Sequence, residues 1–530
     1  MKLEIIFSTI IIHFFFYNIG NFIFEKNILK RSYNDYYHIL ISSLIGLYIF
    51  AITLILINFF FPIYSKFNFY LIIISTIFFL LNLNLKKQKK ILIIIFITSI
   101  LVSFFSLYFQ FGRDAGLYHI PQQNIISNNK VIIGLSQIHS RFGFNSIIEY
   151  VSAFFGHDKL FFLNIINKFF LYTLILFIFY LKNNEDLNSI VISIILLIVL
   201  ILYQRYIYWH ATDLDIPVFI IFTITSYFII NFFNKNTNIN IIFFLIVLLL
   251  SLKSSSAAIL IFLLLIFKNF NKQFFVDKLI KDRFVLILIF CLLIFYINNF
   301  LISGCIIYPA EFLCFDTSWS VKDIATNEKK LIFSHIVGES FWSYINFKNW
   351  IYNHKNFLII SLLIFIIIFA CKSLLKFKDK FKIRNIYLYQ INLYIITLLI
   401  FWLWNAPTIR FGLGALVSLF ITYVYTYSIN SNLKYKKKYY EVLFFMLISF
   451  FILFNYLNVV KYESTNSFNK KKLKVELKKN NNFGFNPANG TDQCWFENWC
   501  YPLRPQLTNK WNNFYLQKYY GYYLFKKNKS

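Results

Sequence analysis

The sequence predicts an all-α polytopic membrane protein with about 12–14 transmembrane helices joined by extracytoplasmic loops. Hydrophobic residues make up 58% of the 530-residue chain and charged residues 14%, with a mean hydropathy of +0.61, whereas a soluble protein carries about a quarter charged residues. Runs of roughly 17–25 apolar residues recur, and each is long enough to cross about 30 Å of hydrocarbon as a helix. Lysines gather in the short connections between these runs, as the positive-inside rule expects.

These basic connections set the expected orientation, because short loops rich in Lys and Arg stay in the cytoplasm. No short apolar core with a small-residue cleavage site opens the chain, so its first run is expected to be a retained span. The short runs 240–252 and 256–267 must both cross, because cytoplasmic loops flank the pair. The most basic connections are Lys86–Lys90, Lys268–Arg283, Lys376–Arg384 and Lys434–Lys438. The expected spans lie near 4–24, 37–61, 67–85, 91–108, 159–181, 188–203, 214–233, 240–252, 256–267, 284–302, 357–375, 386–404, 412–430 and 441–459.

This orientation divides the chain into two parts. Residues 1–460 form the polytopic transmembrane domain, with large outer loops at 109–158 and 303–356. Residues 461–530 form an extracytoplasmic tail that contains Cys and Trp. The segment 204–213 and the turn at 405–410 also lie outside, and no repeat of fixed period is visible.

Cysteine placement agrees with an oxidising outer compartment. Cys291 and Cys371 fall inside apolar spans, where an inert buried thiol is the default. The other four cysteines form two local pairs in outer segments, where disulfides are expected, although a crossed pairing between loop and tail stays open. These pairs are Cys305 with Cys314 and Cys494 with Cys500. No CxxC zinc spacing is present and no histidine lies near either pair, so no metal site is predicted there.

The net charge of +29 does not predict a nucleic-acid partner. The lysines lie in short loops between spans, and the excess of Lys, Asn, Ile, Phe and Tyr is typical of an AT-rich coding bias. Membrane lipids are the expected surroundings of these charges.

Arginine is rare in a lysine-rich composition, so its positions are informative. A planar guanidinium is suited to bidentate contact with phosphate oxygens. Five arginines fall in outer segments, against the positive-inside tendency, and together they predict an anion site at the outer membrane boundary. The alternative is that each pairs with a nearby carboxylate or a lipid headgroup. These residues are Arg113, Arg141, Arg205, Arg410 and Arg504.

The first outer loop contains the candidate catalytic group, Asp114, in FGRDAGLYHIP. A carboxylate at the end of a span can accept a proton from an acceptor hydroxyl. The alternatives are a helix cap or an ion pair with Arg113. His119 lies five residues on, about 1.4 turns if this segment is helical, and it could orient an acceptor or bind phosphate. His139 and Arg141 follow in QIHSRFGFN and have a similar character.

Two further segments supply candidate groups. In YQRYIYWHATDLDIP, Arg205, His210 and Asp213 straddle the start of a span, where ionisable groups are functional candidates. Asp215 belongs to the same segment, and either Asp residue could instead cap the helix beginning near Pro217. Lys253 in SLKSSS could meet a lipid phosphate, or could simply serve a helix hairpin.

Arg410 follows a proline turn and precedes Gly412 and Gly414 in APTIRFGLG. A cation beside small residues at a span boundary can hold a phosphate, because a low dielectric strengthens the contact. We find no P-loop, no GxGxxG after a strand, no HExxH and no GxSxG.

The order of these segments carries a family resemblance over residues of about 100–505. The succession GRDAGLYHIP, GLSQIHSRFGFN, TDLDIP, SGCIIYP, APTIRFGLG and CWFENWC resembles a family of uncharacterised bacterial membrane proteins, which in turn is similar to the GT-C superfamily of integral-membrane glycosyltransferases. The resemblance implies that Asp114 is the acidic residue of the first large external loop and that Arg410 contacts a donor phosphate. The chain departs from that pattern because four spans precede the loop. Arg113 also stands where many members have a second acidic residue, so no cofactor is predicted, although a divalent metal stays open.

The expected function is therefore transfer of a sugar from a polyprenyl-phosphate donor to an extracytoplasmic glycan or lipid acceptor. It is expected at the bacterial inner membrane, on the periplasmic face. Asp114 would deprotonate the acceptor, while Arg410 with Arg141 or Lys253 would stabilise the departing lipid phosphate. An O-antigen-type polymerase or ligase is one alternative. A lipid-linked-glycan flippase or other transporter is another, but it would place polar groups through the bundle midplane, whereas the ionisable residues of this sequence are expected to gather at one face.

Overall fold

The computed structural model describes most of the chain up to residue 355 and shorter pieces beyond it. The described residues are 2–27, 34–63, 85–107, 114–156, 160–184, 187–202, 214–235, 238–260, 282–323, 325, 333–334, 337, 343–355, 358–359, 393, 395–400, 402–403, 409–426, 442–449, 477–480, 484–487, 514–519 and 522–527.

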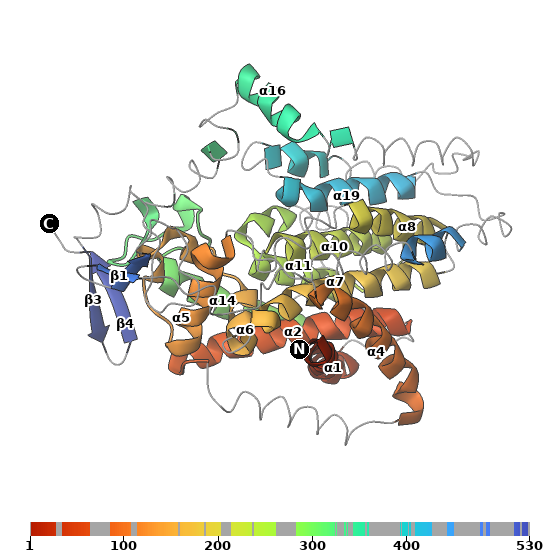
Figure 1. Ribbon diagram of the computed structural model, residues 1–530, viewed down its shortest axis with the longest axis horizontal. Helices are drawn as coiled ribbons and strands as arrows, with labels where there is room; N and C mark the ends of the chain where they lie inside the picture. Colours follow the sequence, from red (N-terminus) through yellow and green to blue (C-terminus); the bar gives the residue numbers. More distant parts are fainter. Residues whose placement is uncertain are drawn as a thin grey trace.

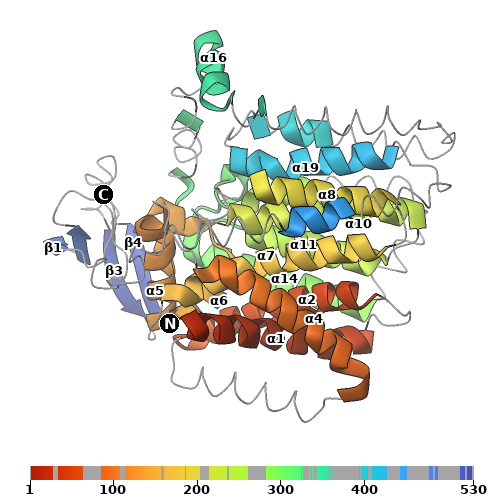
Figure 2. The same cartoon turned by 45° about the vertical axis from the view of Figure 1, so that its right-hand side comes forward.

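The fold is a bundle of long apolar helices, which Figures 1 and 2 show from two sides. The long helices are α1 (Lys2–Asn27), α2 (Asp35–Phe60), α4 (Leu85–Leu107), α7 (Leu160–Asn183), α8 (Leu187–Leu202), α10 (Asp215–Lys235), α11 (Ile239–Leu252), α14 (Arg283–Ser303) and α19 (Ile409–Thr426). Shorter helices are η1 (Ala115–His119), α5 (Ile120–Asn128), η2 (Leu135–Gln137), η3 (Ser140–Gly143), α6 (Ile147–Gly156), η4 (Ser254–Ile259), η5 (Glu311–Leu313) and α16 (Tyr344–Asn353).

Five helices in the described part are long and apolar enough to cross a membrane. They comprise Leu3–Ile23, Asp35–Phe60, Ile165–Asn183, Asp215–Phe232 and Arg283–Ser303. Helices α8, α11 and α19 lie where spans were predicted, but their apolar parts are shorter. The membrane-protein class is therefore confirmed, and most of the predicted span boundaries in this part agree with helix ends to within a few residues. Nearly all of the predicted spans 67–85 and 357–375, and more than half of 386–404 and 441–459, lie outside the described residues.

Local sequence explains where the helices begin and end. Side-chain oxygens of Asn34, Asn238 and Asp282 accept hydrogen bonds from backbone N–H groups two residues on, which caps α2, α11 and α14. Helix α14 ends at Gly304, whose φ of 74° is the left-handed conformation that terminates helices. Helix α4 starts at Leu85, earlier than the expected 91, because lysines and a glutamine extend it beyond its apolar run.

One predicted span differs from the structure in its described part. The run expected at 256–267 begins as the 3-10 helix η4 and not as an α-helix. The hydroxyl of Ser256 donates to the carbonyl oxygens of Leu249 and Lys253. The first carbonyl lies in the last turn of α11 and the second belongs to its C-cap residue, Lys253. Serine side chains commonly compete in this way with the backbone hydrogen bonds that would continue a helix.

The expectation of an all-α chain was wrong for the tail. The strands β1 (Leu477–Asn480) and β2 (Gly484–Pro487) form one antiparallel hairpin, and β3 (Phe514–Tyr519) and β4 (Tyr522–Lys527) form a second. Tyrosine and phenylalanine dominate β3 and β4, and aromatic side chains favour strands. These runs are also far too short to span a membrane as helices.

The helices pack around one large apolar core that extends from α1 to α19. Helices α1 and α2 approach so closely at Gly20 and Gly46 that an added Cβ at Gly46 would lie 1.8 Å from the carbonyl oxygen of Phe16. Small residues permit such contact between membrane helices. Two contacts show that helices α10 and α19 run parallel. Gly414 packs on Phe222, and one turn further along both helices Ser418 bonds to Ser226 at 2.9 Å.

Candidate functional site

Polar contacts between helices show which helix ends lie together at each end of the bundle. At one end, Lys90 of α4 pairs with Asp35 of α2 at 2.7 Å, and the amide of Asn240 donates to Asp282 at 2.6 Å. At the other end, where α2, α11 and α14 finish and α10 begins, the amide of Asn58 donates to the carbonyl oxygen of Asn129 at 2.9 Å. We call this second end the loop end. The division agrees with the orientation that the basic loops predict.

The loop end gathers elements that are far apart in sequence. Figures 1 and 2 show α5 beside α6 at this end of the bundle, with the tail strands beyond them. A pocket lies among η3, η4, α14 and the loop after α14. Its polar and aromatic lining includes Gly143, Asn145, Ser254, Tyr296, Asn299 and Tyr308. The chain segments that contain Arg141 and Lys253 therefore meet around one pocket.

Asp114 forms an ion pair with Arg141 across the first outer loop. Oδ1 of Asp114 accepts a hydrogen bond from Nη1 of Arg141 at 3.0 Å, and both side chains are about one-fifth to one-quarter exposed. Asp114 immediately precedes η1 but makes no capping hydrogen bond. Arg113, with which an ion pair was the alternative to a catalytic role, lies outside the described residues. The guanidinium of Arg141 also lies 5.3 Å from the ring centre of Tyr118.

His119 belongs to a second, more deeply buried polar cluster. Its Nδ1 lies 2.5 Å from Oε1 of Glu149 in α6, and the two side chains are only 3% and 1% exposed. The amide of Gln123 donates to the other carboxylate oxygen, Oε2, at 2.6 Å. Sequence reasoning missed Glu149, although one acidic residue inside the apolar run SIIEYVSAFF was an available signal.

The backbone between Asp114 and His119 is a π-helix, which was not predicted. The amide N–H of Ile120 bonds to the carbonyl oxygen of Ala115, five residues earlier. A π-turn is wider than an α-turn and occurs frequently at functional sites. The wider turn brings residues five positions apart closer to one face than the 1.4 turns of an α-helix would.

Tyr118 links the two polar clusters. Its ring centre lies 4.1 Å from that of His119, and Arg141 lies against the same ring. His139 stacks on Tyr118 at 6.5 Å, and its side chain accepts a hydrogen bond from the backbone N–H of Arg141. Asp114 and Arg141 therefore form one pair and His119 and Glu149 a second, and the ring of Tyr118 lies near a member of each.

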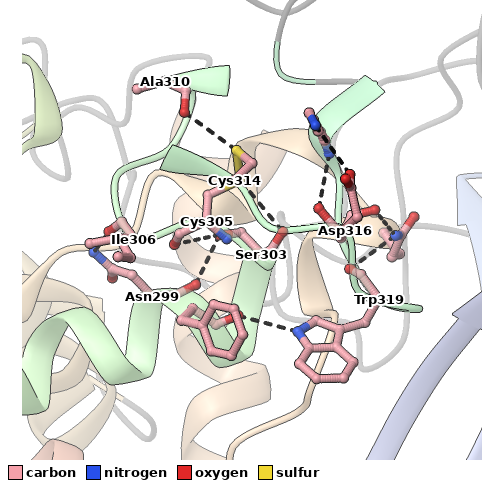
Figure 3. The surroundings of a disulfide bond; sticks show 12 residues. Asn299, Ser303, Cys305, Ile306, Ala310, Cys314, Asp316 and Trp319 are labelled. Atoms are coloured by element: carbon pink, nitrogen blue, oxygen red, sulfur yellow. Dashed lines mark hydrogen bonds and ion pairs between the residues drawn. A yellow bond between two sulfur atoms is a disulfide. The ribbon is translucent and has the colours of Figure 1, made fainter. Parts of the chain in front are cut away.

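The predicted disulfide between Cys305 and Cys314 is present, with a sulfur–sulfur distance of 2.02 Å (Figure 3). It closes a loop whose Tyr308 packs on Gly143, where an added Cβ would lie 2.8 Å from the tyrosine ring. The amide of Gln137 donates to the carbonyl oxygens of Trp319 and Ser320 at 3.0 and 2.7 Å. These contacts attach the disulfide loop to the first outer loop. Cys494 and Cys500 lie outside the described residues.

Lys253 lies at the loop end and forms an ion pair with Asp215 at the start of α10. Asp215 is almost fully buried and Lys253 is about one-fifth exposed. The pair joins the C-terminal end of α11 to the N-terminal end of α10, so part of the positive charge of Lys253 is balanced inside the protein.

Arg410 begins α19 at the same end of the bundle, because α19 runs parallel to α10, which starts at Asp215. Its side chain is not described. Gly412 and Gly414 allow close packing, since an added Cβ at Gly412 would lie 2.5 Å from the ring of Trp402. The remaining candidates, Arg205, His210, Asp213 and Arg504, lie outside the described residues.

Tyr150 and Asn298 add a neutral hydrogen-bonded pair next to the buried Glu149. Burial raises the pKa of the Tyr150 hydroxyl, which keeps it protonated, and this oxygen accepts a hydrogen bond from Asn298 at 2.6 Å. In the described part of the chain, no three His, Cys, Asp or Glu side chains gather to hold a metal ion. The arrangement can bind an anion and move a proton at the boundary of an apolar bundle.

One expectation about the bundle interior was wrong. The ionisable residues do not all gather at one face, because His13 in α1 and Lys168 in α7 are completely or almost completely buried. Nδ1 of His13 lies 2.9 Å from the hydroxyl of Ser99 in α4, and its ring stacks on Tyr172 at 4.0 Å. Both residues lie within apolar runs of the sequence.

Comparison with known proteins gives one match. Residues 3–417 match the model of a family described as a domain of unknown function, DUF8201. No curated protein and no solved structure matches the chain.

Proposed function

Because the chain belongs to the DUF8201 family, whose description assigns no activity, we propose its function from the site itself. It is a membrane glycosyltransferase of the GT-C type that moves a sugar from a polyprenyl-phosphate donor to a glycan or lipid acceptor. The observation that carries this proposal is the Asp114–Arg141 pair beside His119 at one end of an apolar bundle. A carboxylate, a guanidinium and an imidazole there match the needs of an acceptor hydroxyl and a lipid phosphate.

The proposed reaction assigns one task to each group. Asp114 takes the proton from the acceptor hydroxyl as the new bond to the anomeric carbon forms. The bond between that carbon and the donor phosphate breaks, and its electron pair leaves with the phosphate oxygen. Arg141, His119 and Arg410 stabilise the negative charge on the departing phosphate. Lys253 supports this charge more weakly, because it is paired with Asp215.

The location proposed for this chemistry is the periplasmic face of the bacterial inner membrane. The Cys305–Cys314 disulfide supports it, because such bonds persist in oxidising compartments. The lysine-rich segment 86–90, whose Lys90 pairs with Asp35 at the opposite end of the bundle, supports it as well.

Transfer assays with a panel of polyprenyl-phosphate sugars test the proposal, using membranes that contain wild type, Asp114→Asn, Arg410→Ala or Asp316→Asn. Asp316 is a matched control, since it is an exposed carboxylate of the second outer loop paired with Lys322 at 3.1 Å. We expect Asp114→Asn to lose transfer while still binding donor, Arg410→Ala to weaken donor binding, and Asp316→Asn to resemble wild type. Full transfer by Asp114→Asn would remove the proposed base.

A second candidate function is transport of a lipid-linked glycan. The buried His13 and Lys168 favour it, because ionisable groups within a membrane bundle often mark a transport path. Flipping of a fluorescent lipid-linked glycan in reconstituted vesicles distinguishes the two functions. A transporter would move the carrier without breaking its bond to the sugar, and His13→Ala would reduce that movement.

A further inference from the structure

We propose that Glu149 is the positioning residue of His119 and holds the imidazole with a proton on Nδ1, so that Nε2 is the basic nitrogen of the neutral ring. This inference rests on the proposed function for its role in catalysis. The arrangement of the imidazole itself can be tested without any transfer assay.

The first argument is the burial of the pair. Glu149 lies in α6, whose residues are all buried, and its side chain is 1% exposed. A carboxylate removed from water is strongly destabilised unless its oxygens accept hydrogen bonds. His119 Nδ1 meets one oxygen and the amide of Gln123 donates to the other. Both oxygens are thereby occupied and the carboxylate is held in one orientation.

The second argument concerns the shared proton. A carboxylate oxygen can only accept a hydrogen bond, so the hydrogen between Glu149 and His119 is assigned to Nδ1. A histidine whose Nδ1–H is held by a carboxylate has its tautomer and ring orientation fixed. Nε2 then becomes the basic nitrogen of the neutral ring, and the donor when the ring is protonated.

The third argument is the position of the ring. His119 is the last residue of the π-turn η1, which directly follows Asp114. The ring of Tyr118 lies 4.1 Å from that of His119 and 5.3 Å from the Arg141 guanidinium. In the proposed reaction the protonated ring adds positive charge near the Asp114–Arg141 pair, while Glu149 holds the ring in one orientation and balances its charge.

Nitrogen NMR of the full-length protein in lipid nanodiscs, labelled with ¹⁵N only at histidine, tests this directly. The chain has eight histidines, so the spectrum is simple, and comparison with His119→Gln assigns the His119 signals. We expect His119 to be protonated at Nδ1, with a strongly deshielded Nδ1–H proton. In Glu149→Gln we expect that proton signal to move upfield and the ring to become a mixture of tautomers.

Asp215→Asn is the matched control, because it removes a different buried carboxylate at the loop end and breaks the pair with Lys253. It should leave the His119 signals unchanged. The proposal is overturned if wild-type His119 carries its proton only on Nε2. It is also overturned if Glu149→Gln keeps both the other seven histidine signals and the His119 signals of wild type. The wild-type spectrum is decisive even if Glu149→Gln fails to fold, since a deshielded Nδ1–H must be present in it.

The failure of this inference and that of the proposed function are distinguishable. An Nδ1-protonated His119 in a protein that transfers no sugar would preserve the positioning role and remove the reaction. If transfer occurs and is retained in Glu149→Gln, with an unchanged His119 spectrum, the reaction stands and the positioning role falls.

Discussion

The contact between α1 and α2 makes a quantitative prediction for Gly46→Ala. The new Cβ would lie 1.8 Å from the carbonyl oxygen of Phe16, whereas a carbon and an oxygen normally approach to about 3.3 Å. The helices must therefore separate locally by about 1.5 Å, and backbone atoms cannot rotate away as a side chain can. Such a gap removes a large part of the van der Waals attraction along the contact.

The expected net loss for Gly46→Ala is about 2 kcal/mol, since overpacking costs roughly 3 kcal/mol and the gain in helix propensity returns about 1 kcal/mol. Gly414→Ala is the matched control, because its Cβ would lie 3.3 Å from the Phe222 side chain, which needs to move only slightly. We expect that variant to stay within about 0.5 kcal/mol of wild type.

Thermal unfolding in detergent, followed by size-exclusion chromatography of the remaining monodisperse protein, measures both variants. Gly46→Ala should lose its folded fraction at a lower temperature than wild type, and Gly414→Ala should not. If the two variants unfold together at the wild-type temperature, the close packing of α1 on α2 is wrong.

Two further predictions concern the loop end. Replacing both Cys305 and Cys314 by Ser opens a loop of sequence separation 9 and should destabilise the folded outer loops by about 2.6 kcal/mol through chain entropy. Limited proteolysis measures this loss, and we expect the double variant to be cleaved within 303–323 faster than the control variant Cys291→Ser. Equal cleavage rates would contradict the prediction. Removing one partner of the Lys253–Asp215 pair leaves a poorly solvated charge, so Lys253→Met and Asp215→Asn should each destabilise by about 3 kcal/mol, while the double variant should recover part of that loss. A double variant whose unfolding shows simple additivity would mean that the two side chains do not interact.

The bundle could be predicted from sequence because the bilayer imposes a simple rule. A helix that crosses hydrocarbon needs a long apolar run, and the runs at 4–24, 37–61 and 284–302 agree closely with α1, α2 and α14. The rule fails where a segment has less apolar length. The run expected at 256–267 begins instead as the 3-10 helix η4, where the hydroxyl of Ser256 bonds to the carbonyl oxygens of Leu249 and Lys253.

The site was only partly predictable, because tertiary partners leave little trace in sequence. Asp114 and Arg141 could be singled out, since Asp and Arg are rare in this composition and fall in an outer segment. Their mutual ion pair spans 27 residues and follows from the turns at η2 and η3, which no periodicity reveals. Glu149 was hidden for a different reason, because α6 is as apolar as a span and packs on α2 and α7 in the main core, although it lies within the predicted outer loop 109–158.

The identity of the lipid product tests the central claim most directly. Purified wild-type protein in nanodiscs would be incubated with a polyprenyl-phosphate sugar, labelled in the lipid, and with acceptor glycans or lipids. The account predicts release of free polyprenyl phosphate, with loss of that product in Asp114→Asn. Release of polyprenyl pyrophosphate from a diphosphate donor alone, at the same rate in Asp114→Asn, would contradict it and identify a polymerase or ligase instead.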